Sequence, residues 1–221
     1  MFTPQALLQN QVKTFNDLIL VPRLHKELKF FYDNPTEVPE TMMFHGYPGI
    51  GKTSFAILFG RDKCSDFEHL AMNECVRKHG DLENMQLYRK RVTEFYDYGS
   101  PRLPYLMILD EWHDLTEKQQ NIFKVKLETL DQKRVFICLN TDRNNPVTKV
   151  VSRAIRSRAH MIDFNIRQLE LEDHIGEVKK RYDSLTEDEI RQWLPDMRRI
   201  HREHKIRMAM SRLEFLNTEV L

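Results

Sequence analysis

Residues 46–54 combine glycines, a lysine and two hydroxyl side chains at a spacing that suits phosphate binding. The segment matches the pattern GxxxxGK[ST] and runs Gly46-Tyr47-Pro48-Gly49-Ile50-Gly51-Lys52-Thr53-Ser54. Glycines allow successive backbone N–H groups to turn inward around phosphate oxygens, and a helix N-terminus after the loop adds partial positive charge. We expect Lys52 to reach the β- and γ-phosphates and Thr53 to offer its hydroxyl to Mg²⁺. The segment therefore predicts a nucleoside triphosphate site; a glycine-rich turn that arose by chance is the competing interpretation.

Two acids follow the apolar run at residues 106–109. Because ligands of open α/β sheets bind at the carboxyl ends of the strands, we expect Asp110 and Glu111 to face the phosphates. Asp110 would hold Mg²⁺ through a water molecule, and Glu111 would polarise the attacking water as a general base. A solvated pair of acids at the end of a strand is the alternative. We interpret His113, just beyond the pair, as a surface or capping residue.

An amide follows the apolar run at residues 135–139 in the same way. Asn140 would lie at the same edge of the sheet, where its side chain could orient the attacking water or contact the γ-phosphate. An ordinary loop asparagine is the competing interpretation. If the first interpretation holds, Asn140 belongs to the same site as the acidic pair.

Short apolar runs, with helical or turn-forming stretches between them, indicate the elements that position these residues. The runs occupy residues 41–44, 67–72, 106–109, 135–139 and 160–164. This alternation is typical of an α/β fold, a parallel sheet with helices on both faces. A capping-box pattern at residues 116–119 and apolar residues at 122, 123, 125, 127 and 130 predict a helix between the third and fourth runs.

The character of the sequence changes after residue 164. Dense charge and helical periodicity follow, with no further strand candidate. We therefore expect a nucleotide-binding core over residues 1–164 and a small helical lid domain over residues 165–221. A chain of 221 residues with 41% hydrophobic content is long enough for both.

The overall composition excludes several classes of protein. Lysine plus arginine number 34 against 33 acids, for a net charge of +1, so no global field drives the chain onto nucleic acid. The three cysteines form no CxxC pair, which fits buried thiols in a reducing compartment. There is no signal-peptide pattern and no apolar run near the ~18 residues that span a bilayer. We expect a soluble intracellular protein, cytoplasmic or nuclear, without membrane contact.

The order of these motifs resembles that of the clamp-loader ATPases of the AAA+ class, related to replication factor C small subunits. The matching segments are the family's N-terminal box at 13–17, Walker A at 43–54, Walker B at 109–111, a helix start at 115–120, sensor 1 at 135–140, a motif similar to serine-arginine-cysteine at 155–159, and sensor 2 at 195–199. The first three are shared widely among AAA+ proteins, and the motif at 155–159 is the most specific. The resemblance implies an AAA+ P-loop core with a helical lid, ATP and Mg²⁺ as cofactors, and ATP hydrolysis.

The resemblance also assigns arginines and partners. Arg158 matches the arginine that the family inserts in trans into the ATP site of the neighbouring subunit, and Arg198 matches the cis arginine of the lid. Arg153 and Arg156 are further candidates for the trans role, with a solvated basic surface as the alternative. The implied partners are other AAA+ subunits in a homo- or hetero-oligomer, a sliding clamp and primer-template DNA. Basic residues within 77–91 are candidates for DNA contact, and those within 198–212 are a second set.

The sequence departs from the family at a few positions. Ala159 stands where the motif has cysteine, and His113 interrupts the acid-rich continuation of Walker B. The chain ends soon after Arg198, where the family continues into a helical collar, so we expect no collar domain. Two other functions stay open: an AAA+ helicase loader or other DNA-associated AAA+ assembly switch, and a noncatalytic assembly subunit that binds ATP without turnover. The intact phosphate-binding loop and acidic pair argue against the noncatalytic subunit.

Overall fold

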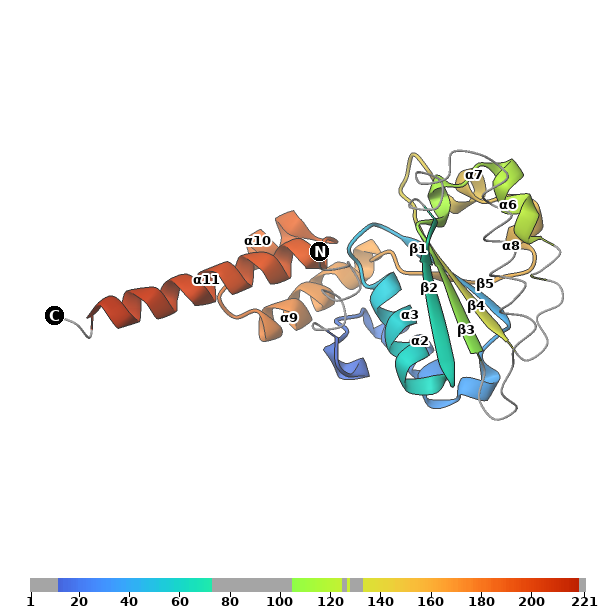
Figure 1. Ribbon diagram of the computed structural model, residues 1–221. Helices are drawn as coiled ribbons and strands as arrows, with labels where there is room; N and C mark the ends of the chain where they lie inside the picture. Colours follow the sequence, from blue (N-terminus) through green and yellow to red (C-terminus); the bar gives the residue numbers. More distant parts are fainter. Residues whose placement is uncertain (1–11, 73–104, 125–126, 128–132, 219–221) are drawn as a thin grey trace.

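A parallel sheet of five strands forms the centre of the molecule (Figure 1). The computed structural model describes residues 12–72, 105–124, 127 and 133–218. The strands are β1 (Thr41–Gly46), β2 (Asp66–Ala71), β3 (Tyr105–Asp110), β4 (Arg134–Asn140) and β5 (His160–Asp163). Their order across the sheet is β2-β3-β4-β1-β5, and every neighbouring pair is parallel. The five predicted runs and the α/β fold class are thus confirmed.

The three inner strands, β3, β4 and β1, are buried on both faces of the sheet, which explains why they are nearly continuous apolar runs. In β1, Met42 and Phe44 belong to one buried apolar cluster, whereas Met43 belongs to another. In β4, Phe136 and Ile137 divide between the same two clusters. Because successive side chains of a strand point to opposite faces, the two clusters are the two sides of the sheet.

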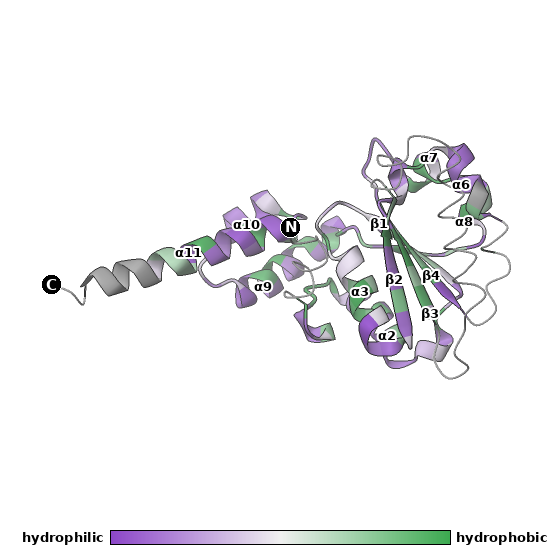
Figure 2. Cartoon of the chain, in the orientation of Figure 1, coloured by the Kyte–Doolittle hydropathy of each residue, from purple (hydrophilic) through white to green (hydrophobic). Residues whose placement is uncertain are grey.

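Helices cover each side of the sheet (Figure 1). On the first side, α2 (Pro22–Asp33) and α3 (Lys52–Lys63) bury their apolar residues in the first cluster. On the second side, α6 (Glu117–Phe123) and α8 (Arg153–Arg156) contribute to the second cluster, next to the short α7 (Val147–Val150). Figure 2 shows hydrophobic stretches in the inner strands β3 and β4, in keeping with their place between the helix layers.

The predicted helix after residue 116 begins at the predicted cap. Thr116 Oγ1 accepts a hydrogen bond from the backbone N–H of Gln119 at 3.4 Å, and the Gln119 side chain accepts one from the Thr116 N–H at 2.8 Å. The first bond satisfies an N–H group that has no partner within the helix, and the second satisfies the N–H of the cap residue itself. Beyond α6, the predicted positions 125 and 130 lie outside the described residues, and Leu127 is buried in the second cluster.

Beyond the sheet, the described chain is helical. The helices α9 (Leu171–Arg181), α10 (Glu187–Trp193) and α11 (Met197–Thr218) form an arm that projects from the sheet (Figure 1). Single 3-10 turns elsewhere are η1 (Phe15–Asp17), η2 (Pro35–Glu37), η3 (Trp112–Asp114) and η5 (Gln168–Glu170). The arm has its own apolar cluster, made up of Ile175, Val178, Leu185, Ile190 and Ile200.

That third cluster supports a domain division at residue 164, which stays our proposal.

Within the described part of the chain, none of the helices combines the length and the apolar character that a membrane crossing needs.

The strand order gathers the predicted site residues at one edge of the sheet. Because β4 lies between β1 and β3, the carboxyl ends of these three strands are adjacent. The phosphate-binding loop leaves β1 at this edge, Asp110 ends β3, and Asn140 ends β4 beside Gly46. Residues that are far apart in the sequence therefore meet next to the loop.

Candidate nucleotide-binding site

Glycines shape the loop between β1 and α3, because the backbone adopts conformations there that other residues avoid. Gly49 and Gly51 have φ angles of 79° and 102°, and Gly51 caps the start of α3. A Cβ atom on Gly49 would lie 2.5 Å from Asp196 Oδ1, next to the start of α11. The loop therefore packs directly on the helical arm, and only glycine fits at position 49 without strain.

The side chain of Lys52 is buried beneath this loop. Its Nζ donates hydrogen bonds to the backbone oxygens of Gly46 (2.9 Å) and Tyr47 (2.6 Å) and to Asn140 Oδ1 (3.1 Å). Burial lowers the pKa of Lys52 to about 8. The hydrogen-bond partners of the ammonium are all neutral, so its charge is available to an anionic ligand.

Asp110 has a partner on each carboxylate oxygen. Thr53 Oγ1 donates to Asp110 Oδ1 at 3.2 Å, and His69 Nε2, from β2, lies 3.1 Å from Asp110 Oδ2. Burial acts to raise the pKa of Asp110, but the hydrogen bond and charge of His69, together with further hydrogen bonds, outweigh it and lower the pKa. A hydroxyl and an ionised carboxylate are hard oxygen ligands of the kind that Mg²⁺ prefers. Thr53 and Asp110 therefore fit the predicted metal site.

Glu111 occupies a sharp turn at the end of β3. Among the described residues it is the one non-glycine residue with a positive φ angle, 54°, and the turn leads directly into η3. Asn140 Nδ2 donates to Glu111 Oε2 at 3.3 Å. Burial, and then the negative charge of Asp110, raises the pKa of the Glu111 carboxyl. A carboxylate whose pKa is raised in this way suits a general base.

The interpretation of His113 as a surface or capping residue is wrong. Its ring is partly buried, its Nδ1 accepts the backbone N–H of Asn140 at 3.2 Å, and its Nε2 lies 3.4 Å from Glu111 Oε2. The one signal in the sequence is its position two residues after the acidic pair. Its contact with Asn140 depends on β4 lying beside β3, which no local pattern reveals.

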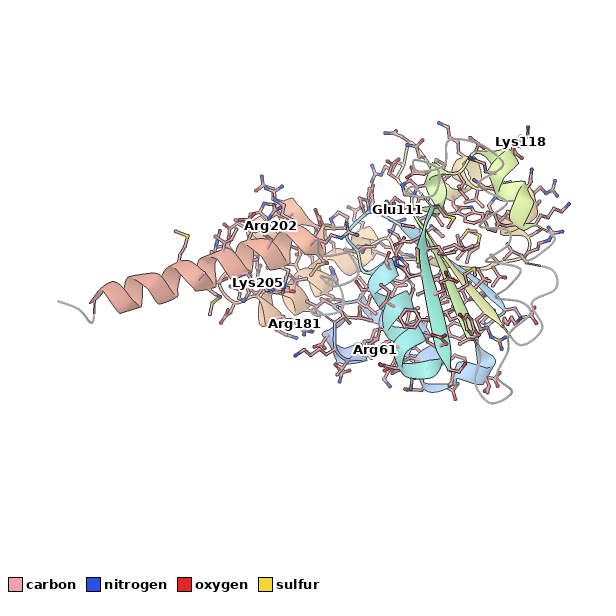
Figure 3. All side chains as sticks on the ribbon, in the orientation of Figure 1. Arg61, Glu111, Lys118, Arg181, Arg202 and Lys205 are labelled. Carbon is pink, nitrogen blue, oxygen red and sulfur yellow. The ribbon has the colours of Figure 1, made fainter. Side chains whose placement is uncertain are left out.

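A cavity of about 530 Å³ opens beside these residues. Loop residues 49–54 line it together with Asp110, Glu111 and Asn140, and the arm contributes Arg198 as predicted. The sequence analysis missed other lining residues, among them residues 18–20, Arg181, Tyr182, His201, His204, Lys205 and Met208. Figure 3 shows Glu111 at the end of the strands, with Arg181 and Lys205 on the neighbouring arm. The cavity therefore lies between the sheet edge and the arm.

Gly46, Tyr47 and Pro48, also predicted as nucleotide-binding, lie outside this lining. The first two instead hold the Lys52 ammonium through their carbonyl oxygens.

Arg158 follows α8 and is not part of the lining either. Its guanidinium donates hydrogen bonds to the backbone oxygen of Ala154 and to Ser157 Oγ. The structure thus does not bring Arg158 to the cavity of its own chain.

The two basic segments considered for DNA contact differ in what the structure describes. Residues 77–91 lie outside the described residues. Within 198–212, Arg207 donates to Glu189 and to the backbone oxygen of Ser184, so it joins α11 to the start of α10. Arg202 and Lys205 are exposed on α11 (Figure 3). Because their side chains are exposed and the Arg207 side chain is bonded within the arm, Arg202 and Lys205 are better placed than Arg207 to contact DNA.

Comparison with known proteins identifies the class. Residues 42–168 match the family model of the AAA proteins, the ATPase family associated with various cellular activities, and the chain belongs to this family. Its relatives include replication factor C small subunit 2 of Pyrobaculum islandicum, 27% identical over 155 residues, and that of Pyrobaculum aerophilum, 30% identical over 126 residues. The matches cover 69% and 56% of this chain but only 46% and 37% of the relatives, so the chain spans less than half of their length.

Solved structures support the same fold. DnaA from Aquifex aeolicus, bound to AMPPCP, aligns with a TM-score of 0.60 at 14% identity, over 92% of this chain and 64% of that one. The RuvB branch migration motor of Thermotoga maritima aligns with a TM-score of 0.50 at 17% identity, over 78% and 55% of the two chains. The predicted AAA+ P-loop fold and the kinship with replication factor C small subunits are therefore confirmed.

We expect Gly49→Ala to weaken nucleotide binding by about tenfold, because a left-handed backbone at a non-glycine residue costs roughly 1–2 kcal/mol and the new methyl group meets Asp196. Titration calorimetry with a nonhydrolysable ATP analogue measures the effect. Gly176→Ala is the matched control: a Cβ there meets no heavy atom within 4 Å, so binding should be unchanged while helix α9 gains about 0.5–1 kcal/mol of stability. Equal affinities for both variants would contradict the assigned role of the loop.

Proposed function

We propose that the chain binds ATP with Mg²⁺ in this cavity and hydrolyses it, as one AAA+ subunit of an oligomer. The observation that carries the proposal is the set of contacts across three adjacent strands. Lys52 contacts Asn140, which contacts Glu111, while Thr53 contacts Asp110. These contacts bring a phosphate-binding cation, a polar amide, a general base and two metal ligands to one cavity.

The loop and the metal ligands would hold the substrate. Backbone N–H groups of residues 49–54 would surround the phosphates, and Lys52 would exchange its carbonyl partners for β- and γ-phosphate oxygens. Thr53 and Asp110 hold the cation, Asp110 through water. Mg²⁺ bound there neutralises phosphate charge.

Glu111 and Asn140 would act on the attacking water. Glu111 would accept a proton from the water as the water oxygen bonds to the γ-phosphorus and the bond from that phosphorus to the bridging oxygen breaks, which releases ADP and phosphate. Asn140 would hold the Glu111 carboxylate while contacting Lys52. Arg198 reaches the nucleotide from the arm in cis. Arg158, which lies away from its own cavity, supplies its charge to the site of a neighbouring subunit.

We further propose that this ATPase serves a complex of the clamp-loader type, with a sliding clamp and primer-template DNA as partners. The kinship with replication factor C small subunits supports this choice. An AAA+ helicase loader, or another DNA-associated assembly switch, would share the ATP site and differ in its partner.

Two substitutions separate binding from turnover. Lys52→Ala should weaken ATP binding by about 100-fold or more, ~2.7 kcal/mol, because the main counter-charge to the phosphates is lost. Glu111→Gln should bind ATP normally and lower kcat by about 10²–10⁴-fold. Lys63→Ala, at the other end of helix α3, is the control and should change neither quantity. Normal turnover by the Glu111→Gln variant would rule out this residue as the general base.

Arg158→Ala should lower kcat by about 10³-fold and leave ATP affinity nearly unchanged, as expected for a contact made in the transition state. Mixing it with the Glu111→Gln variant should restore part of the activity, because some mixed interfaces then contain both groups. Each variant alone at the same total concentration is the control. An assembled mixture without recovery would count against action in trans.

The partner is tested with the Glu111→Gln variant, which should hold ATP without turnover. With ATP, it should retain the sliding clamp of its own organism in a pull-down, and primer-template DNA should stimulate hydrolysis by the unmodified protein. The Lys52→Ala variant should retain much less clamp. Recovery of a replicative helicase in place of the clamp would favour the helicase-loader alternative.

A further inference from the structure

His113 lies beside two residues that line the cavity, Glu111 and Asn140, and is not itself part of the lining. The left-handed turn at Glu111 leads into η3, where the neighbouring Trp112 is fully buried and packs edge-on against Phe123 with ring centroids 5.1 Å apart. The side chain of Trp112 is buried in the core, and the ring of the next residue, His113, contacts Asn140 at the end of β4.

The hydrogen bonds of the ring define where its proton sits. The backbone N–H of Asn140 donates to His113 Nδ1 at 3.2 Å, so Nδ1 must carry a lone pair. In a neutral imidazole the other nitrogen then carries the hydrogen. Nε2–H is therefore the donor. Asn140 Nδ2, which lies 3.4 Å from Nε2, is itself a donor and cannot serve as its acceptor.

Glu111 Oε2 lies 3.4 Å from Nε2 and Asp114 Oδ1 lies 3.9 Å from it, so the Glu111 carboxylate is the nearer of the two acceptors to this N–H. The same oxygen accepts a hydrogen bond from Asn140 Nδ2 at 3.3 Å. Oε1 has no hydrogen bond within the described residues. Oε2 therefore accepts one hydrogen bond and has the His113 N–H close by, whereas Oε1 is left for water. Catalytic hydrogen bonds commonly shorten when substrate binds.

We propose that His113 is a positioning residue for Glu111: held by the Asn140 backbone as the Nε2–H tautomer, it directs that hydrogen to Oε2 and leaves Oε1 to meet the attacking water. The inference rests on the proposed hydrolysis of ATP. His113 touches neither nucleotide nor water in this role, so it should affect kcat and not the affinity for ATP.

Two amide variants divide the contacts of the ring between them. His113→Asn places an amide near the position of Nδ1, where it can still accept the Asn140 N–H, but it is too short to reach Glu111. His113→Gln extends to the position of Nε2 and can donate to Glu111 Oε2. The variant that stays active therefore shows which of the two contacts matters: the one with Glu111 if it is His113→Gln, the one with Asn140 if it is His113→Asn.

We expect His113→Asn to lower kcat by about 10- to 100-fold, as for a small misplacement of a catalytic group, with KM for ATP and Tm near those of the unmodified protein. His113→Gln should keep kcat within about threefold of the unmodified value. His160→Asn, an exposed residue at the start of β5, is the control and should leave kcat unchanged. Unchanged kcat in His113→Asn, or equal losses in the Asn and Gln variants, would overturn the proposal.

A second measurement does not depend on turnover. In protein with ¹⁵N-labelled histidine, the imidazole signals that disappear in His113→Asn should belong to a ring with hydrogen on Nε2 and none on Nδ1. A ring with hydrogen on Nδ1 would overturn the proposal, even if the kinetics agreed. If the unmodified protein hydrolyses no ATP, the proposed function fails, whereas the tautomer of His113 is still decided by these signals.

Discussion

The buried ammonium of Lys52 is the charge around which the site is arranged. Taking an ammonium out of water is unfavourable unless other groups replace its hydration. Two of the replacing oxygens are carbonyls of the loop itself, which requires the backbone to fold back over its own lysine. The third is Asn140 Oδ1, and it reaches Lys52 because Asn140 and Gly46 are register partners on adjacent strands. The oxygens that replace the hydration of the Lys52 ammonium therefore also hold the loop against β4.

Asn140 also links the Lys52 ammonium to the acidic pair, because it contacts both Lys52 and Glu111. Because its amide oxygen is used by Lys52, its NH₂ group must point the other way, towards Glu111. Each acid also has a histidine beside it, His69 at Asp110 and His113 at Glu111. The two carboxylates thus differ in environment, and their pKa values shift in opposite directions, down for Asp110 and up for Glu111. Such a difference separates a metal ligand from a general base.

The loop and the helical arm meet at Asp196. Asp196 Oδ1 accepts the backbone N–H groups of Arg198 and Arg199 at the start of α11, at 3.1 and 3.2 Å. The same oxygen lies against Gly49. A change in the loop at this point would therefore act on the cap of α11, next to Arg198 of the cavity lining.

Contiguous stretches of sequence were enough to predict the strands, the phosphate-binding loop and the acidic pair. Apolar runs, a capping box at Thr116 and the spacing of Gly46 to Thr53 are local patterns, and local backbone preferences act on them directly. The roles of His69 and His113, and the lining contributed by Tyr182 and its neighbours, could not be found in this way. Those contacts exist because β4 lies between β1 and β3 and because the base of the arm packs against the loop. Both arrangements are decided by long-range packing of apolar faces. The sequence by itself determined which chemical groups are present at the strand ends; the tertiary structure decided which of them touch.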